Sequence, residues 1–507
     1  MNAKHTKKLA IKSNESRLPS GVFSRRYALP NGERASVAYH TPSQSVIFFE
    51  GDSAEVWWKI FQASGRTENA RDYILQNGTF DGDPDSEAEA TLAGFIDDLR
   101  ASNLMAPLRA DKNGHQNGNI SEPSVKKAVD VTENPELAIG QFMADHRILY
   151  SLVLELTYRC NEKCVHCYLP QETRLPELSL QQIDELMGEF ASMGGLQIQL
   201  TGGEAFARKD IVSILGLTKK HGLVTSITTN LTLLNDDILN AIVAISPRSV
   251  GCSIYAARPE LHDAITLVKG SFEKSVRAIR SLRAAGIPVI IKSPLMKTTA
   301  PHWREIEALA KELGCEYQFD LSITAKNDGK LSPLAHRVDD REVLNDIFSS
   351  RYYKLYVGDE LMSTMAGPSP EAGLCGAGAS GLAVSPDGTI RPCIGLNIPL
   401  GQWPKNSLAE VWHKSPFFAE FGAIKLRDIS PCNACPELAF CSRCPGAWLA
   451  EHGDFRKPSP YTCVLARAWA GVQRANSENE FSSLEKLGCL KGGDTDETEN
   501  ENKALCS

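Results

Sequence analysis

The sequence predicts an α/β protein built around a partial β/α barrel of six strands, with a winged-helix-like domain before it and a cysteine-rich extension after it. Strand and helix patterns alternate between residues 148 and 330. A hairpin pattern and three amphipathic helices precede residue 108, and further cysteines cluster after residue 372. Because domains average about 150 residues, the 507 residues also indicate three or four domains.

The composition is that of a globular protein, with 42% hydrophobic and 23% charged residues. No apolar run reaches the roughly 18 residues of a membrane span, and the N-terminus lacks the apolar core of a secretory signal. The net charge of −8 disfavours a nucleic-acid surface. We therefore expect a cytoplasmic protein that binds neither membrane nor nucleic acid. In a reducing compartment, clustered cysteines bind metal more often than they pair.

Changes in pattern divide the chain into segments. We expect a flexible basic tail (1–30), the winged-helix-like domain (31–108), a linker (109–147), the barrel (148–330), a bridging segment (331–372), the cysteine-rich extension (373–475) and an acidic disordered tail (476–507). Lysines and arginines mark the first tail, Asn-Gly pairs mark the linker, and aspartates and glutamates mark the last tail.

Apolar alternation and helical periodicity define the barrel. Strands are expected near 152–156, 196–200, 223–228, 249–254, 287–292 and 316–321, and helices near 205–220, 235–245, 271–285 and 301–313. A further helix should begin at the capping box formed by Ser179 and Gln182. Such alternation predicts a parallel sheet, with the active site at the C-terminal ends of its strands.

The first group of cysteines is Cys160, Cys164 and Cys167, spaced C-x3-C-x2-C after the first barrel strand. Three thiolates leave the four-ligand shell of a structural zinc incomplete. They can hold three irons of a four-iron cluster and leave the fourth iron open to a small molecule. A zinc site completed by His166 is the alternative.

This loop, together with Gly202-Gly203-Glu204 after the second barrel strand, resembles the radical S-adenosylmethionine (SAM) superfamily over about residues 148–325. The resemblance implies that the three cysteines hold a [4Fe–4S] cluster whose open iron binds the amino and carboxylate groups of SAM. Reductive cleavage of SAM would give a 5′-deoxyadenosyl radical that abstracts hydrogen from a substrate. An electron donor such as flavodoxin or ferredoxin is implied as a partner.

Seven barrel residues are then expected to contact SAM: Tyr168, Gly202, Gly203, Glu204, Asn230, Ser253 and Lys292. The glycines would let backbone approach the ligand closely, and Glu204 would accept from the ammonium group. Asn230 and Ser253 would bond ribose hydroxyls. Tyr168 would lie against adenine, and Lys292 would meet the carboxylate. Ordinary loop polarity is the alternative for the last four.

The second group comprises Cys375, Cys393, Cys432, Cys435, Cys441, Cys444 and Cys463. It resembles the SPASM extension, which holds two auxiliary [4Fe–4S] clusters, although two residues rather than three separate its last adjacent pair. The resemblance implies that one cluster is fully ligated by Cys432, Cys435, Cys441 and Cys463. The other would have only Cys375, Cys393 and Cys444, which leaves an open or non-cysteine site. Two zinc-ribbon sites are the alternative.

The N-terminal third bears on the substrate. A winged helix usually suggests DNA, but residues 50–100 are rich in acids, whereas DNA-binding surfaces are basic. The segment is similar to the RiPP recognition element, a domain that binds the leader of a ribosomally made precursor peptide. Such domains add the leader as a strand to a sheet edge. A tethered leader would present its core peptide at high effective concentration. A purely structural domain is the alternative.

These observations predict a radical SAM peptide maturase that installs a thioether or carbon–carbon crosslink in a precursor peptide. One alternative is a formylglycine-generating, sulfatase-activating enzyme of the same superfamily. Another, of a different class, is a non-enzymatic zinc-ribbon and winged-helix binding protein.

Overall fold

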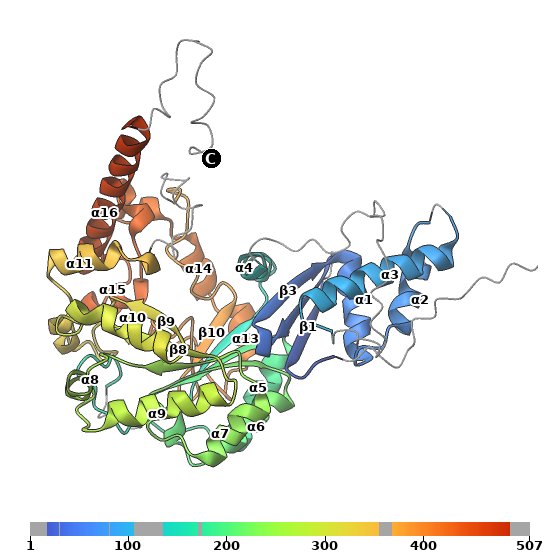
Figure 1. Cartoon of the computed structure of the whole chain (residues 1–507), viewed down its shortest axis with the longest axis horizontal. Helices are drawn as coiled ribbons and strands as arrows, with labels where there is room; N and C mark the ends of the chain where they lie inside the picture. The colour runs from blue at the N-terminus through green and yellow to red at the C-terminus, as the bar shows by residue number, and fades with distance from the viewer. Residues whose placement is uncertain are drawn as a thin grey trace, which may run out of the picture.

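The computed structural model describes residues 18–29, 31–80, 82–105, 135–170, 175–353 and 368–486. Its centre is a nine-stranded sheet with the order β12-β11-β10-β4-β5-β6-β7-β8-β9 (Figure 1). The six strands of the predicted barrel are β4 (Ser151–Glu155), β5 (Gln197–Thr201), β6 (Val224–Thr229), β7 (Ser249–Ser253), β8 (Val289–Pro294) and β9 (Glu316–Asp320). Each pairs in parallel with the next. The predicted fold class is confirmed.

Helices cover the outer face of this sheet. They are α5 (Leu180–Ser192), α6 (Ile211–Lys220), α7 (Asp236–Ile245), α8 (Pro259–Thr266), α9 (Ser271–Ala284) and α10 (Trp303–Glu312). The predicted capping box begins α5, with the Ser179 hydroxyl accepting from the Gln182 amide at 3.2 Å and the Gln182 side chain accepting from the Ser179 amide at 2.9 Å. Of the six helices, α8 was not expected from the sequence.

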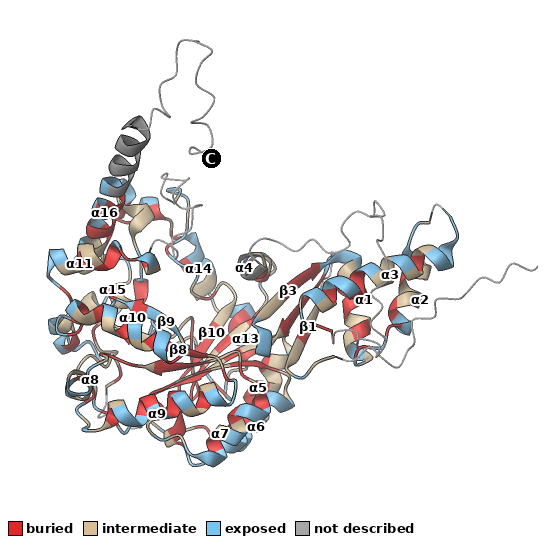
Figure 2. Cartoon of the chain, in the orientation of Figure 1, coloured by how far each residue is buried: buried red, intermediate tan, exposed pale blue. Residues whose placement is uncertain are grey.

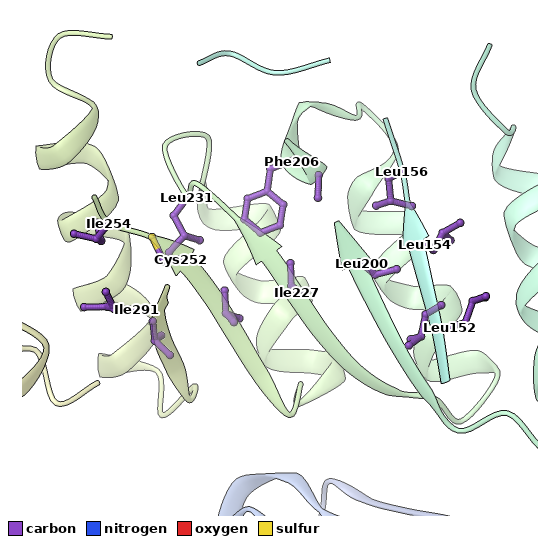
Figure 3. Packing of buried hydrophobic residues seen from close by; sticks show 14 of the residues in the cluster. Leu152, Leu154, Leu156, Leu200, Phe206, Ile227, Leu231, Cys252, Ile254 and Ile291 are labelled. Atoms are coloured by element: carbon purple, nitrogen blue, oxygen red, sulfur yellow. The ribbon is translucent and has the colours of Figure 1, made fainter. Parts of the chain in front are cut away.

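Strand residues alternate between the two faces of the sheet. Leu152, Leu154, Leu200, Ile227 and Ile291 are buried on the helix side, in one continuous core (Figures 2 and 3). Their neighbours along the strands face the barrel interior and are mostly polar. Because side chains of a strand alternate, the apolar positions secure the sheet while the polar ones remain available to line a cavity.

The sheet extends beyond the barrel. Strand β10 (Gly381–Val384) pairs in parallel with β4, opposite its partner β5, and β11 (Thr389–Arg391) and β12 (Gly401–Gln402) follow in antiparallel pairing. The cysteine-rich extension is therefore continuous with the barrel through backbone hydrogen bonds. These strands are two to four residues long and were not predicted, because so short a run has no detectable period.

The remaining helices of the C-terminal half are α11 (Arg341–Phe348), α13 (Leu408–Lys414), α14 (Phe417–Ala423), α15 (Pro445–His452) and α16 (Pro460–Lys486). Short 3-10 helices lie at Thr41–Ser43, Ala205–Ala207, Ala300–His302, Ser332–His336, Leu426–Asp428, Cys432–Ala434 and Leu438–Phe440. The backbone of α16 continues past residue 475, where the acidic tail was expected to begin. Residues 487–507, including Cys489 and Cys506, lie outside the described part. Within the described ranges, no helix combines the length and apolarity that crossing a bilayer requires.

The N-terminal domain is a three-stranded antiparallel sheet, β1 (Val22–Ala28), β2 (Arg34–His40) and β3 (Ser45–Glu50), followed by α1 (Gly51–Gln62), α2 (Glu68–Asn77) and α3 (Pro84–Ala101). The three helices were predicted, but β1 corrects the prediction of a tail over 1–30. Strand β1 was not recognised in the sequence because its basic residues are typical of a solvated tail. Arg26 bonds Glu55 of α1 with Nε–Oε1 at 2.6 Å, and Arg25 bonds the carbonyls of His221 and Gly222.

This domain packs against the N-terminal ends of the barrel strands. The hydroxyls of Tyr39 and Tyr150 lie 2.9 Å apart, and the Gln197 amide donates to Tyr39 at 2.7 Å. Helix α4 (Pro135–Asp145) covers one face of the small sheet, with the Phe142 ring 5.2 Å from that of Phe48. The sequence predicted a linker across 109–147, so α4 is a correction; residues 106–134 lie outside the described part.

Candidate active site

A cavity of about 790 Å³ opens at the C-terminal ends of the barrel strands. Polar side chains of the inward strand positions form one wall: Gln199, Thr201, Thr228, Ser253, Lys292, Gln318 and Asp320. The opposite wall comes from the C-terminal half and is more apolar, with Phe348, Tyr352, Tyr353, Phe440, Leu465 and Trp469. The barrel and the extension thus build a single site.

The loop after β4 brings Cys160, Cys164 and Cys167 to this cavity. The three thiols are close enough to interact electrostatically. Cys164 Sγ lies 3.5 Å from both Tyr255 Oη and Glu162 Oε2. Thiolates that hold a four-iron cluster bind different irons, so they stand farther apart than the ligands of a single ion. The arrangement fits such a cluster.

A single-ion site is not formed here. Among the residues that the structure describes, no three His, Cys, Asp or Glu side chains are placed to hold one metal ion. His166 packs edge-on against Tyr255 with ring centroids 4.8 Å apart, and its Nδ1 is buried without a partner. The geometry therefore does not support a zinc site completed by His166.

The glycines of the loop after β5 are required by neighbouring backbone. Gly202 has φ +137°, and a Cβ there would lie 2.2 Å from the Thr157 carbonyl oxygen; at Gly203 it would lie 2.6 Å from that of Arg159. The Gly203 amide donates to the Thr157 oxygen at 2.7 Å. Both glycines line the cavity, but what they approach in this structure is the cysteine loop.

Glu204 has a different environment from the predicted one. Its side chain is 1% exposed and is not on the cavity wall. The carboxylate accepts from the Thr229 hydroxyl at 2.6 Å and from the amides of Asn230 and Phe206 at 2.7 and 2.9 Å. Burial raises its pKa. Glu204 thus fastens the β5 loop to the end of β6. Its role as an acceptor for the ammonium group stays a prediction.

The other four predicted contacts all line the cavity. The Asn230 side chain donates to Asn161 at 3.1 Å and accepts from the Thr232 hydroxyl at 2.8 Å. Tyr168 Oη donates to Glu155 at 3.5 Å. These bonds hold both side chains in place. Their roles toward a ligand stay predictions.

Lys292 is the cation of the polar wall. It extends beside Gly251, where a Cβ would lie 2.9 Å from Lys292 Cε. Burial lowers its pKa. No carboxylate among the described residues forms an ion pair with it, which leaves the ammonium group available to an anionic ligand.

The thiols of the second group lie near one another in two regions, and their division into two ligand sets stays a prediction. Burial raises the pKa of Cys375, and the nearby thiols of Cys393 and Cys444 raise it further. Because such an effect acts only over a short distance, these three thiols are neighbours. Cys432, Cys435, Cys441 and Cys463 interact among themselves in the same way. Cys444 also lines the cavity, together with the three cysteines of the first loop. Cys252, buried in β7, and Cys315 belong to neither set.

Sequence reasoning missed the buried Glu155–Arg391 ion pair and the aromatic wall. Glu155 ends β4, and Arg391 ends β11. Nothing in either strand indicates that residues so far apart in sequence pair.

An α/β barrel with three thiols after its first strand and a cysteine-bearing extension over its open end is the architecture of radical SAM enzymes with auxiliary clusters. The radical SAM superfamily domain matches residues 154–313, and the SPASM iron–sulfur cluster-binding domain matches residues 375–436. The chain belongs to the radical SAM superfamily, carries a SPASM extension and is an enzyme of that class.

Two curated relatives each match about three fifths of this chain. The AdoMet-dependent heme synthase of Methanosarcina barkeri is 27% identical over 336 residues, which are 61% of this chain and 95% of the relative. The PqqA peptide cyclase of Ruegeria pomeroyi is 26% identical over 320 residues, 60% of this chain and 83% of the relative.

A solved structure resembles nearly the whole chain. Streptococcus suis SuiB, in its crystal structure bound to the precursor peptide SuiA, superposes with a TM-score of 0.57 at 16% identity. The match covers 88% of this chain and 99% of SuiB. It supports the fold assignment, and its coverage of this chain is larger than that of the sequence relatives.

Proposed function

We propose that this enzyme uses SAM to abstract a hydrogen atom from a residue of a ribosomally made precursor peptide and so installs a thioether or carbon–carbon crosslink. The observation that carries the proposal is the shared cavity, which is lined both by cysteines of the first loop and by Cys444 of the extension. At about 790 Å³, the cavity has room for a peptide side chain beside SAM.

The residues present fit a [4Fe–4S] cluster and SAM. Cys160, Cys164 and Cys167 would hold the cluster. When bound, the cluster and SAM supply a 5′-deoxyadenosyl radical through one-electron reduction from a donor such as flavodoxin or ferredoxin. Lys292 would orient the SAM carboxylate, and Gly203 would hold the β5 loop against the cysteine loop. The aromatic wall would limit the access of water to the site.

Two auxiliary clusters are part of the proposal. The separation of the cysteines supports full ligation of one cluster by Cys432, Cys435, Cys441 and Cys463. The set of Cys375, Cys393 and Cys444 leaves one position open beside the cavity. A peptide thiolate there would suit a thioether product, and a water ligand would suit a carbon–carbon bond.

The N-terminal domain would bind the leader of the precursor. Strand β3 is an edge of its sheet, and no other described strand pairs with its outer side. An unpaired edge offers backbone donors and acceptors to an added strand.

Hydrogen–deuterium exchange on the full chain tests this leader site. Peptides encoded by short reading frames beside the gene should slow exchange of the amides of residues 45–50. Strand β1, packed beside the barrel, serves as the internal control and should not change. Protection absent from β3 would refute leader binding at this edge.

Heme synthesis is the other function that the relatives favour. Its specific support is that the match spans 95% of the Methanosarcina enzyme. That match covers 61% of this chain, so much of the chain has no counterpart in it. A mass change in a co-incubated precursor peptide, with no turnover of a porphyrin precursor, would decide for peptide modification; the reverse result would decide for heme synthesis.

A further inference from the structure

A buried ion pair joins the barrel to the extension. Glu155 is 0% and Arg391 1% exposed at the side chain, and Arg391 Nη2 bonds Glu155 Oε2. The pair lies between two cysteine loops, because Glu155 ends β4 just before the first loop and Arg391 ends β11 two residues before Cys393.

Glu155 holds both flanks of the first cysteine loop. Tyr158, two residues before Cys160, donates to Glu155 Oε2 at 3.0 Å. Tyr168, which follows Cys167 directly, donates to Oε1 at 3.5 Å. One carboxylate therefore sets the positions of both ends of the C-x3-C-x2-C segment.

Arg391 continues the connection into the second group. Its Nη1 donates to Asn397 Oδ1 at 3.5 Å, and Asn397 Nδ2 donates to the Asn327 carbonyl at 3.4 Å. The Asn327 amide donates to the carbonyl of Tyr168 at 2.9 Å, which closes a ring of bonds. The positive charge of Arg391 also acts on the Cys393 thiol, together with burial and amide hydrogen bonds.

Stability alone is a poor reason for such a pair. A buried ion pair often contributes no more to folding than well-packed apolar residues of the same volume. Arg391 Nε is moreover buried without a partner, which adds an unpaired donor. The pair is thus better explained by what its charges and bonds do for the adjacent loops.

We propose that Glu155 and Arg391 form a positioning pair that fixes the Cys393 loop against the Cys160–Cys167 loop, and that the Arg391 charge makes an auxiliary cluster on Cys375, Cys393 and Cys444 easier to reduce. This inference rests on the cluster assignment made above. Reduction adds one electron to the cluster, and a nearby cation stabilises the added negative charge. Glu155 opposes that effect from the far side of Arg391.

Substitutions of the two residues should therefore shift the midpoint potential of this auxiliary cluster in opposite directions. Arg391→Met should lower the midpoint potential, because Glu155 either keeps its charge or takes up a proton, and neither restores the cation. Glu155→Gln should raise it, because Arg391 keeps its charge without the opposing carboxylate. Arg391→Lys should stay near the original value.

The experiment is a redox titration followed by electron paramagnetic resonance. The full chain with Cys160, Cys164 and Cys167 changed to alanine removes the SAM-binding cluster and leaves the auxiliary signals. Arg427→Met is the matched control, since Arg427 pairs with Glu371 on the surface of the same extension. That control should leave the potential unchanged.

Shifts of the same sign for Arg391→Met and Glu155→Gln, or no shift with iron content retained, would overturn the proposal. So would loss of iron in both Arg391→Lys and Arg391→Met, since the pair would then serve folding alone. Absence of auxiliary iron before any change at Glu155 or Arg391 would instead refute the cluster assignment under the proposed function, and this inference would fall with it.

Discussion

At the two glycines after β5, the constraint is the backbone of the cysteine loop. A Cβ at Gly202 or Gly203 would strike the carbonyl oxygens of Thr157 or Arg159, and the contact of these glycines with a ligand stays a prediction. This close approach also links the β5 loop to the cysteine loop, because the Gly203 amide donates to the Thr157 carbonyl oxygen.

Gly203→Ala should therefore weaken SAM binding and lower the free energy of unfolding by about 1–3 kcal/mol, the usual cost of overpacking. Gly216→Ala is the matched control. Gly216 lies in α6 with nothing within 4 Å of an added Cβ, so alanine should stabilise by about 0.5–1 kcal/mol. Calorimetry of SAM binding and denaturant unfolding measure both effects. Equal behaviour of the two variants would contradict the packing argument.

Cys164→Ala should abolish 5′-deoxyadenosine formation under reductant, because two thiolates no longer hold the cluster that binds SAM. Cys315→Ala, which removes a thiol outside both cysteine sets, should leave formation intact. Chromatography of the quenched reaction measures the product. Persistent 5′-deoxyadenosine in Cys164→Ala would refute the cluster assignment.

Lys292 gives the site a pH dependence. Burial lowers the pKa of its ammonium group, and only the charged form attracts a carboxylate. SAM affinity should therefore be full below that pKa and fall as the pH rises through it, at a lower pH than for an exposed lysine.

Lys292→Met should weaken SAM binding at neutral pH and remove the alkaline decline. Equilibrium dialysis of the reconstituted protein across pH 7–10 measures both effects, with about 10.4 as the reference pKa of an exposed lysine. A decline that survives in Lys292→Met would show that another group titrates.

The sequence could identify residues that belong to short motifs with a recognisable spacing. Short intervals such as Cys432 to Cys435 mark the cysteine groups, whereas the division into two ligand sets came from the resemblance to the SPASM extension and stays a prediction. The hydrogen-bond partners of Glu204 and Arg391 could not be assigned this way. Glu204 is engaged by Thr229 and two backbone amides, and Arg391 pairs with a glutamate 236 positions away. Only the packed fold reveals such partners.

At the level of single elements, the strands of the barrel were predictable and the short strands of the extension were not. The barrel strands have outward apolar residues such as Leu152 and Ile198 at alternate positions, and helices of regular period follow them. Strand β10 has only four residues, and its place beside β4 is set by the edge that the barrel leaves open. Strand β1 was hidden because its charged side chains find partners in α1 and in the barrel.

Helix α15 places Cys444 opposite Cys393. Its Gly446 lies so close to the Cys393 loop that a Cβ would lie 2.1 Å from the Gly395 carbonyl oxygen. Gly446→Ala should push α15 away and reduce the iron bound by the set of Cys375, Cys393 and Cys444. Gly471→Ala in α16, with nothing within 4 Å, is the control. Iron and sulfide analysis compares the two; equal iron would show that α15 does not position this site.

For the whole molecule, the two proposed peptide sites face opposite ends of the barrel. The N-terminal domain packs at the N-terminal ends of the strands, through Tyr39 and Tyr150, and the cavity opens at their C-terminal ends. Strands of five residues at roughly 3.3 Å each span about 17 Å. A peptide bound to β3 must cover at least that distance to reach the cavity.

A precursor should therefore need at least about five or six extended residues between its leader contact and the modified residue. Shortening that spacer below this number should abolish modification while leaving affinity for the chain unchanged. Lengthening it should have little effect, because loop-closure entropy grows slowly with length. Mass spectrometry of a spacer series, with binding measured in parallel, checks both. Modification of a precursor without a spacer would contradict the placement of the leader on β3.

The most direct test of the central claim is deuterium transfer from the precursor peptide to 5′-deoxyadenosine. A precursor deuterated at its non-exchangeable carbon positions is incubated with reconstituted enzyme, SAM and reductant. The masses of 5′-deoxyadenosine and of the modified peptide are then measured by mass spectrometry. We expect 5′-deoxyadenosine that has gained one deuterium and a peptide that has lost it. Modified peptide accompanied only by unlabelled 5′-deoxyadenosine would contradict hydrogen abstraction by the radical in this cavity.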